Sequence, residues 1–553
     1  MSDQNEMVKA IEGRIAEEEA AVTGGKKPVE ITSKFVMECL DAEQLGDGML
    51  YAALHKDKFV YAKNSQQWFV WDEHTWRRDD LDAAISAVEQ VAMRYAAEIS
   101  TLEEKIEAAK KSGDDDDYKW AKRTVGRKVE RIRSRVATLR KNQGRQNCIQ
   151  FAHTNPVNPI SIFGDEFDMK PNLLGVQNGV IDLHTGLLMK GNPSDYVSKR
   201  CGTVYNGLAI NNKIWIDTLN QIYDGDQDLI AFMQRLYGSA LFGTCEEHVF
   251  PVLIGRGRNG KSIMIEAISH TLGDYAGAVP AELLLDSNRP SSANQPDSVL
   301  MKLKGLRLAI ASETGEGRKF SAERVKWLTG GDTITARGLY DKHLVDFEPT
   351  HLLVLLTNHE PVAPAGDVGF WERCFLIRHP LSFVKNREPE KDYERKADTT
   401  LPAKLKEAGP EILAWLVQGY IDWRKHGLMP PESVIKSTDD YRSDSDYIGA
   451  FITAACTIKK GSNVGATELY IAFTLWFRKT INDNKRFTPS QKIFGQKLKA
   501  REEYEVKKSN GITYYHGLEL SYEYKEMVLK EALREDSRSG SAEYQGGRED
   551  HFT

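Results

Sequence analysis

The stretch Gly255-Arg-Gly-Arg-Asn-Gly260-Lys261-Ser262 decides the fold of this chain, because it matches the phosphate-binding pattern G-x-x-x-x-G-K-[ST] at every fixed position. An apolar run at residues 249–254 precedes it, and a run with helical character at residues 263–272 follows it. A strand, a glycine-rich turn and a helix in that order point backbone amides and the positive end of the helix dipole at a phosphate. The pattern therefore predicts a nucleoside triphosphate site, with ATP as the ligand, formed by Gly255, Arg256, Gly257, Arg258, Asn259, Gly260, Lys261 and Ser262.

Two side chains of this loop have predicted chemical roles. Lys261 is expected to reach the β- and γ-phosphates, and the Ser262 hydroxyl is expected to coordinate Mg²⁺. An ordinary glycine-rich turn is the alternative explanation. It would not require a strand before the turn and a helix after it, so the nucleotide site is favoured.

The composition is that of an ordinary globular protein of several domains, with 553 residues, 41% hydrophobic residues and 28% charged residues. No apolar stretch approaches the ~18 residues of a membrane span, so no membrane partner is expected. The six cysteines lie far apart without a C-x-x-C pair, which indicates reduced thiols in a cytoplasm rather than a zinc ribbon. A net charge of −6 means that any nucleic-acid binding must come from local patches.

Three later segments resemble the remaining parts of an ATPase. Residues 305–312 read as a buried strand, and Glu313 follows it, where a Walker B carboxylate would bind Mg²⁺ together with Ser262. Glu316 is a possible second acid, and an acidic turn without function is the alternative. A third apolar strand ends at Asn358, whose amide can position water, and a fourth strand begins directly after Arg373.

This ordered set of motifs resembles superfamily 3 helicases, in particular the branch of poxvirus and of phage or plasmid primase–helicases. The resemblance rests on the P-loop, Glu313, Leu328-Thr-Gly-Gly-Asp-Thr through His343, Thr357-Asn358 with Pro361, and Trp371-Glu-Arg373. Residues 60–210, with a tryptophan-rich hairpin and Gln177-Asn-Gly-Val-Ile-Asp-Leu, look like the domain that precedes the helicase in that branch. Together these segments cover roughly residues 59–451.

The resemblance implies a catalytic set of Lys261, Glu313, Asn358 and Arg373. Glu313 would be the Walker B acid, Asn358 the sensor of the γ-phosphate, and Arg373 an arginine finger that reaches the site of a neighbouring subunit. Such a finger implies a homo-oligomeric ring, which in this family is a hexamer. A surface ion pair is the alternative for Arg373. Because Ser312 and Thr314 flank Glu313 where many members carry two adjacent acids, the identity of the general base stays open.

The resemblance also implies contacts with DNA. Lys342 and His343 would lie at the tip of a hairpin in the central channel and grip single-stranded DNA by charge and stacking. An ordinary exposed turn is the alternative for this pair. Lys326 and Arg337 would assist phosphate or DNA contact.

A multidomain α/β protein is therefore expected, with a P-loop AAA+-like ATPase core built on a parallel sheet, an α+β domain before it and a winged-helix domain after it. The expected domains are a flexible or helical extension (1–58), an α+β domain with the tryptophan-rich hairpin (59–210), the superfamily 3 ATPase core (211–385), a helical lid or linker (386–445), a winged-helix-like domain (446–534) and a disordered tail (535–553).

Two basic segments lie outside the ATPase motifs. From Lys119 to Arg145 the chain has eleven Lys or Arg and one Glu, which fits either a contact with a phosphate backbone or a solvated helix paired with acids, and the sequence does not choose between them. Near the C-terminus, a capped basic helix and a hairpin around Asn510-Gly511 indicate a winged helix. The residues expected to face DNA there are Lys492, Lys497, Lys499, Arg501, Lys507 and Lys508. A protein-binding winged helix is the alternative.

The favoured function is a hexameric, ATP-driven DNA helicase that translocates on single-stranded or forked DNA in phage- or plasmid-type replication, in the host cytoplasm if a phage encodes it. One alternative is a bifunctional primase–helicase, although no zinc-ligand set exists and the residues before the hairpin are few for a polymerising domain. The other is an origin-binding initiator ATPase without processive unwinding. A separate primase or polymerase could be a partner.

Overall fold

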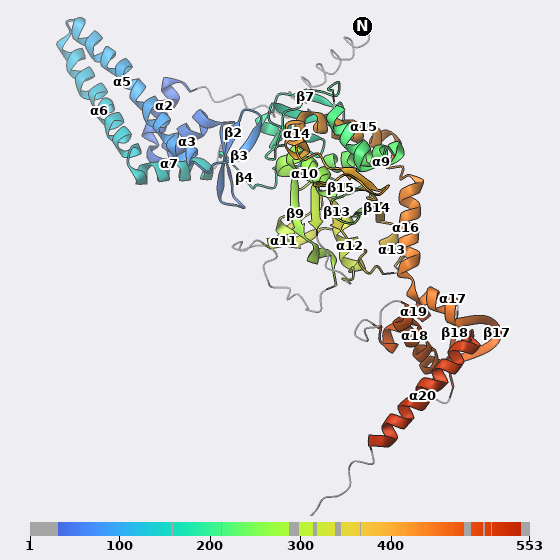
Figure 1. The fold of residues 1–553 in the computed structure, drawn as a ribbon. Helices are drawn as coiled ribbons and strands as arrows, with labels where there is room; N and C mark the ends of the chain where they lie inside the picture. Colours follow the sequence, from blue (N-terminus) through green and yellow to red (C-terminus); the bar gives the residue numbers. More distant parts are fainter. Residues whose placement is uncertain are drawn as a thin grey trace, which may run out of the picture. The chain divides into compact units, whose positions relative to one another are not determined.

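The computed structural model describes residues 31–155, 159–211, 213–286, 298–312, 318–337, 344–364, 367–480, 488–501, 504–509 and 511–542. These residues divide into two compact units (Figure 1). The first contains residues up to 181 together with 189–200, and the second contains residues 182–188 and 201 onward. No helix among the described residues is long and apolar enough to span a membrane.

The first unit combines a helical arm with two small sheets. Its longest helices, α5 (Val88–Lys111) and α6 (Asp115–Leu139), pack against each other along their length. The acid run that interrupts them in the sequence starts α6, because the Asp114 carboxylate accepts hydrogen bonds from the amides of Asp116 and Asp117. The other helices are α2 (Ser33–Asp41), α3 (Glu43–His55), α4 (Ala83–Ser86) and α7 (Asn142–Thr154).

The expected tryptophan-rich hairpin is part of a larger sheet. Strands β2 (Gln67–Asp72) and β3 (Thr75–Arg78) pair antiparallel, as predicted, and β1 (Phe59–Ala62) and β4 (Ser161–Ile162) extend the sheet in the order β3-β2-β1-β4. A second sheet has the order β5-β6-β7, from β5 (Leu173–Val176), β6 (Gly179–Asp182) and β7 (Leu187–Met189). The turn at residues 184–186 joins β6 and β7.

The N-terminal boundary differs from the expected extension of residues 1–58. Helices α2 and α3 are part of the core of the first unit, where Val36, Leu40, Leu50 and Tyr51 are buried among residues of α5, α6 and α7. The physical reason is amphipathic packing: each of these two helices has an apolar face that α5 and α7 cover. The extension can therefore include at most the residues before α2.

The second unit is built around a parallel five-stranded sheet in the order β14-β8-β13-β10-β9. The strands are β8 (Phe250–Ile254), β9 (Ala276–Pro280), β10 (Leu308–Ser312), β13 (Leu352–Thr357) and β14 (Cys374–Arg378). Every residue of β8 and β13 is buried, as expected for the central strands of a parallel sheet. Because all five strands run the same way, their carboxyl ends form one edge of the sheet.

Helices pack around this sheet. Residues 213–239 form two helices, α8 (Lys213–Ile222) and α9 (Gln227–Ser239), and Asp226 caps α9 by accepting a hydrogen bond from the Leu229 amide. The remaining helices of this part are α10 (Lys261–Leu272), α11 (Ser298–Met301), α12 (Ala322–Thr329), α13 (Val368–Trp371), α14 (Leu401–Glu407), α15 (Gly409–His426) and α16 (Glu432–Ser445).

The segment 386–445 is a packed part of the ATPase unit rather than a separate lid. Helix α15 lies so close to α9 that a Cβ on Gly238 would meet the Gly419 carbonyl carbon at 2.3 Å. Helix α16 packs on β14, where the Thr438 hydroxyl accepts a hydrogen bond from the Leu376 amide at 3.0 Å. Strand β16 (Glu394–Lys396) of this segment pairs with β15 (Ser382–Val384), which lies just before it in the chain.

The C-terminal module has the element order helix, strand, helix, helix, strand, strand. Its elements are α17 (Tyr447–Ala455), β17 (Cys456–Gly465), α18 (Ala466–Thr480), α19 (Gln491–Ala500), β18 (Glu505–Ser509) and β19 (Ile512–Leu520), and its sheet has the order β17-β19-β18. Strands β18 and β19 pair from Ser509 and Ile512 outward, so the predicted hairpin is present. Helix α20 (Tyr522–Ala542) continues beyond residue 535, where the sequence predicted a disordered tail.

Candidate functional site: a P-loop at the carboxyl edge of the parallel sheet

The P-loop connects β8 to α10 at the carboxyl edge of the sheet. Its backbone turns through left-handed conformations at Gly257, Arg258 and Gly260, with φ of +30°, +57° and +84°. Two features require glycine at position 260. Its φ is positive, and a Cβ would meet the Ile222 side chain at 2.6 Å. The twelve residues of α10 follow directly, so the N-terminus of this helix faces the loop. This arrangement fits a phosphate group, whose charge the loop amides and the helix dipole would stabilise.

Lys261 lies beneath this loop as the first residue of α10. Its ammonium donates hydrogen bonds to the Gly255 carbonyl at 2.7 Å and to the Asn358 amide oxygen at 3.4 Å. The residue is buried, with 4% of its surface exposed, and burial lowers the pKa of its ammonium to about 8. A triphosphate would supply the negative charge that these neutral oxygens do not. Ser262 occupies the next position of the helix and is exposed.

Asn358 reaches this site because β13 lies beside β8. Thr357 pairs with Ile254, so Asn358 and Gly255 each follow the last paired residue of neighbouring strands. The structure therefore brings together two of the predicted catalytic residues that are 97 positions apart. Strand β10 ends at Ser312 on the other side of β13. Glu313 and Glu316 follow in the sequence but lie outside the described residues, so their predicted roles stay predictions.

His379 belongs to the surroundings of the P-loop and was not singled out from the sequence. It follows β14, its amide donates to the Ile254 carbonyl at 2.7 Å, and its ring is buried against Tyr223. Burial, and next the charge of Lys261, lower the pKa of His379 to about 3, so its ring is neutral. No motif marks this histidine. Only the pairing of β14 with β8 reveals that it lies behind the loop.

Arg373 lies at the opposite edge of the sheet. It precedes β14, and Cys374 pairs with Phe250 at the start of β8, whereas the P-loop follows Ile254 at its end. Its guanidinium donates to the Gly369 carbonyl at 2.7 Å. Nearby, Lys326 of α12 forms an ion pair with Asp367 at 2.9 Å. The strand length therefore separates Arg373 and Lys326 from the P-loop of the same subunit.

The predicted channel hairpin is described only at its base. Strands β11 (Ile334–Ala336) and β12 (Val345–Phe347) pair antiparallel, with Ala336 opposite Val345. Arg337 is the last described residue on one side, and Lys342 and His343 lie outside the described residues. The two paired strands are consistent with a hairpin whose connecting segment contains both residues. The position of Lys342 and His343 at its tip and their contacts with DNA stay predictions.

The cations of the C-terminal module fall into two groups. Lys492, Lys499, Lys507 and Lys508 are exposed on α19 and β18. Arg501, which we expected to face DNA, instead donates to both carboxylate oxygens of Asp446, at 2.9 and 2.7 Å. The ammonium of Lys497 lies 4.2 Å from the centre of the Tyr447 ring. Arg501 and Lys497 are thus held within the module.

Comparison with known proteins identifies the relationship. Residues 48–224 match the family described as D5 N terminal like. Over 320 residues, the chain is 31% identical to "Putative helicase L207/L206" of Acanthamoeba polyphaga mimivirus, which covers 55% of this chain and 33% of that protein. Over 337 residues, it is 25% identical to "Putative primase C962R" of African swine fever virus, which covers 58% of this chain and 34% of that protein. Over these residues the chain is similar to D5-like primase–helicases.

The family match covers the expected α+β domain of residues 59–210 and extends beyond it at both ends. The chain also spans about a third of the length of the curated relatives named above. Among solved structures, the C-terminal region of NrS-1 (305–718) gives a TM-score of 0.42 at 11% identity, covering 86% of this chain and 99% of that one. The similarity to D5-like proteins is carried by the match of residues 48–224 and by the viral relatives.

Proposed function

We propose that this D5-like chain is an ATP- and Mg²⁺-dependent DNA helicase of superfamily 3 that acts as a homo-oligomeric ring, a hexamer, during DNA replication. The observation that carries the proposal is the contact of Lys261 with both Gly255 and Asn358 at the carboxyl edge of the sheet. In this contact, the ammonium proposed to bind phosphate lies next to the amide proposed to sense the γ-phosphate. Viral relatives named as helicases and primases support the same class of activity.

Each of these residues has a proposed role in hydrolysis. Lys261 and the P-loop amides would hold the phosphates, Ser262 and Glu313 the Mg²⁺ ion, and Asn358 the attacking water. Held by these residues, Mg²⁺ would supply positive charge against the charge that develops as the terminal phosphoryl group is transferred. Arg373 would stabilise that charge from the neighbouring subunit, because it lies at the edge of the sheet opposite its own P-loop.

DNA contacts are proposed in two places. The hairpin of β11 and β12 would present Lys342 and His343 to single-stranded DNA in the ring, with Arg337 at its base. The C-terminal module would act as a winged helix, supported by its element order and by the β17-β19-β18 sheet. Exposed Lys492, Lys499, Lys507 and Lys508 would meet the phosphate backbone.

Strand displacement on forked DNA tests this function. The wild-type chain should displace a labelled strand with ATP and Mg²⁺, whereas Lys261→Ala and Arg373→Ala should both reduce displacement by about 100-fold or more. Arg424→Ala is the matched control, because Arg424 is a surface cation paired with Glu246 and should leave displacement unchanged.

Measurements of ATP hydrolysis, DNA binding and primer synthesis beside strand displacement separate the alternatives. ATP hydrolysis with DNA binding but no strand displacement would favour an origin-binding initiator. Primer synthesis from nucleoside triphosphates would favour a bifunctional primase–helicase, which the relatives named as primases make worth testing. Absence of primer synthesis together with displacement would point to priming by a separate primase or polymerase.

A further inference from the structure

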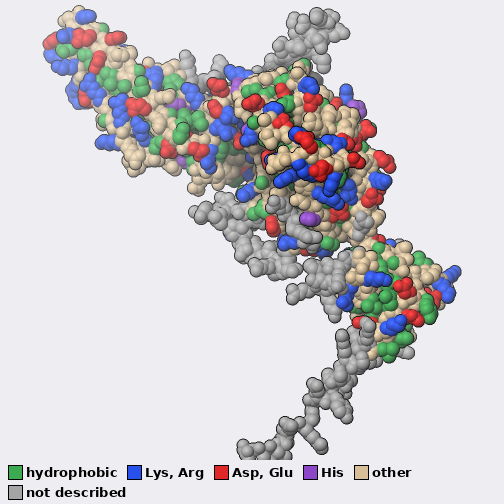
Figure 2. All heavy atoms as spheres, viewed as in Figure 1, with side chains coloured by type: hydrophobic (Ala, Val, Ile, Leu, Met, Phe, Trp, Pro, Cys, Tyr) green, Lys and Arg blue, Asp and Glu red, His purple; other side chains and the backbone are tan. Residues whose placement is uncertain are grey.

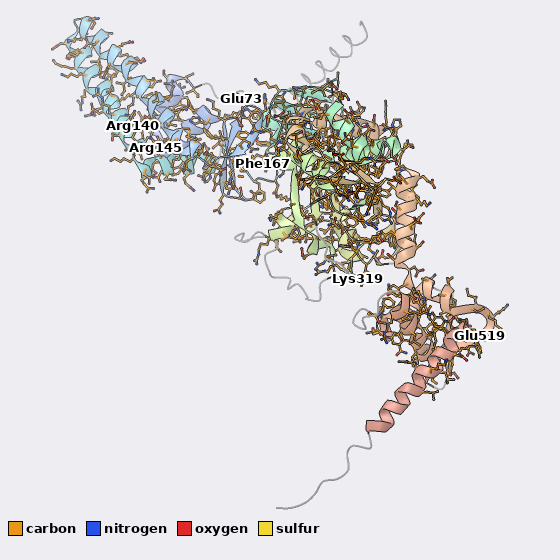
Figure 3. The ribbon with its side chains drawn as sticks, viewed as in Figure 1. Glu73, Arg140, Arg145, Phe167, Lys319 and Glu519 are labelled. Carbon is orange, nitrogen blue, oxygen red and sulfur yellow. The ribbon has the colours of Figure 1, made fainter. Side chains whose placement is uncertain are left out.

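The basic stretch of residues 119–145 divides into two parts in the structure. In the part nearer α7, the cations hold helices together. Arg131 pairs with Asp41 of α2, Arg133 with Glu103 of α5 and Arg135 with Asp47 of α3. Arg140 and Arg145 pair with the two carboxylate oxygens of Glu89, at 2.8 and 3.2 Å. Figure 3 labels the two arginines on this part of the chain. These arginines form ion pairs with acids of the same unit, as the alternative of a solvated helix paired with acids predicts.

The part nearer the start of α6 behaves differently. Residues 120–128 contain four cations, Lys122, Arg123, Arg127 and Lys128, and no acid. All four are exposed, and no ion pair involving them occurs among the described residues. Trp120, which precedes them, has 63% of its surface exposed. Figure 2 shows Lys and Arg side chains gathered along this arm.

Helix geometry places three of these residues on one face. Trp120, Arg123 and Arg127 follow the spacing i, i+3, i+7, which repeats on one side of a helix. The buried residues Ala121, Val125 and Val129 lie on the side that packs against α5. The outer face of α6, defined as Trp120, Arg123 and Arg127, therefore presents an aromatic ring and two guanidinium groups to solvent.

We propose that the outer face of α6 binds single-stranded nucleic acid, as a contact separate from the ATPase and from the C-terminal module. A base would stack on Trp120, and the adjacent phosphates would pair with Arg123 and Arg127, with Lys122 and Lys128 adding to the positive field. The three residues span about 10 Å along the helix, which matches two or three stacked nucleotides at about 3.4 Å each. Stacking does not depend on base identity, so this contact is independent of sequence.

Two other anionic partners fit this surface less well. A duplex has no unpaired base to stack on Trp120, so it would leave the exposed ring unused. A helix that lies on an anionic membrane needs a broad apolar face in addition to its cations. The apolar face of α6 is already buried against α5, and its outer face has one aromatic residue among charges.

Photo-cross-linking tests the proposal on the full-length chain without nucleotide. An oligothymidylate with 5-iodouracil should cross-link on irradiation to the peptide that contains Trp120. Trp120→Ala should abolish that cross-link, and Arg123→Gln/Arg127→Gln should lower the slope of log affinity against log salt by about 1.4, the value for two phosphates of a single strand. Arg131→Gln/Arg133→Gln is the matched control, since it removes two charges of the same helix that are already paired, and it should leave the cross-link in place.

The outcomes are distinct from those of the helicase assay. The inference rests on the proposed function only in its choice of a single-stranded partner. A persistent Trp120 cross-link with no strand displacement would overturn the helicase and leave this contact standing. Absence of a cross-link in residues 112–131 would overturn the contact. An equal loss of the cross-link in the Arg131→Gln/Arg133→Gln control would also overturn the contact. The same holds if Arg123→Gln/Arg127→Gln weakens binding to phosphatidylserine vesicles but leaves binding of the oligonucleotide unchanged.

Discussion

The fold buries Lys261 without a negatively charged partner among its described hydrogen-bond acceptors. Its ammonium is buried and donates to two neutral oxygens, so the charged form is less stable here than in water. The pKa of about 8 records this cost. The neighbouring His379 is neutral and so adds no second positive charge. The proposed triphosphate would supply the negative partner that restores the charged form of Lys261.

This environment predicts that nucleotide binding takes up a proton above pH 8. Below that pH, Lys261 is charged before and after binding, and affinity should not change with pH on its account. Above it, the free ammonium loses its proton and the complex regains it, so affinity should fall with rising pH by up to about tenfold per unit. Calorimetry from pH 7 to 9.5 in buffers of different ionisation enthalpy measures this uptake.

Lys261→Arg provides the control for this pH dependence. A guanidinium does not lose its proton in this range, so the variant should bind nucleotide more weakly but with a flat pH profile. A wild-type affinity that stays constant between pH 7.5 and 9 would show that Lys261 is charged in the free protein.

The sequence predicts the residues of the site better than it predicts their surroundings. The P-loop could be recognised because its function depends on consecutive residues, and Asn358 because a polar residue ends a buried strand. His379 could not be recognised, because its place behind the loop depends on which strand lies beside β8. Arg501 was assigned to DNA by its position on a basic helix, but its partner Asp446 is 55 positions away and invisible to local pattern.

At the level of elements, local signals predicted strands and hairpins, while long-range packing set the boundaries. The hairpins β2–β3 and β18–β19 follow from alternating residues around short turns. The packing of helices α2 and α3 into the core was missed, because their burial depends on α5 and α7, far along the chain. The close approach of α9 and α15 at Gly238 and Gly419 was also hidden, since each glycine alone resembles a helix defect.

The two groups of cations in the C-terminal module predict different effects of substitution. Arg501→Gln should lower the free energy of unfolding of this module by about 1–2 kcal/mol, because it removes a partly buried ion pair, from Nη1 to both carboxylate oxygens, with the residue that caps α17. Lys499→Gln should leave stability unchanged and weaken binding to duplex DNA. Chemical denaturation and fluorescence anisotropy separate the effects. Equal losses of DNA affinity at unchanged stability would instead place Arg501 at the DNA.

For the whole molecule, the parallel sheet separates the two halves of the proposed catalytic site. The P-loop and Asn358 lie at the carboxyl edge, while Arg373 lies where β14 begins. The Arg373 guanidinium donates a hydrogen bond to the Gly369 carbonyl there, and the ion pair of Lys326 with Asp367 lies beside it. A single subunit therefore cannot use its own Arg373 at its own P-loop. A ring with head-to-tail contacts places the finger of one subunit at the nucleotide of the next.

Subunit mixing tests this arrangement. Lys261→Ala and Arg373→Ala proteins should each lack ATPase activity alone. In mixed rings, an Arg373→Ala subunit still provides an intact P-loop, and a neighbouring Lys261→Ala subunit still provides an intact finger. Random assembly at equal amounts should make about a quarter of the contacts complete, so activity should return in part. If the two variants co-assemble, as shown by pull-down with distinct tags, and no activity returns, Arg373 does not act across subunits. Retained activity of Arg373→Ala alone would exclude it from hydrolysis altogether.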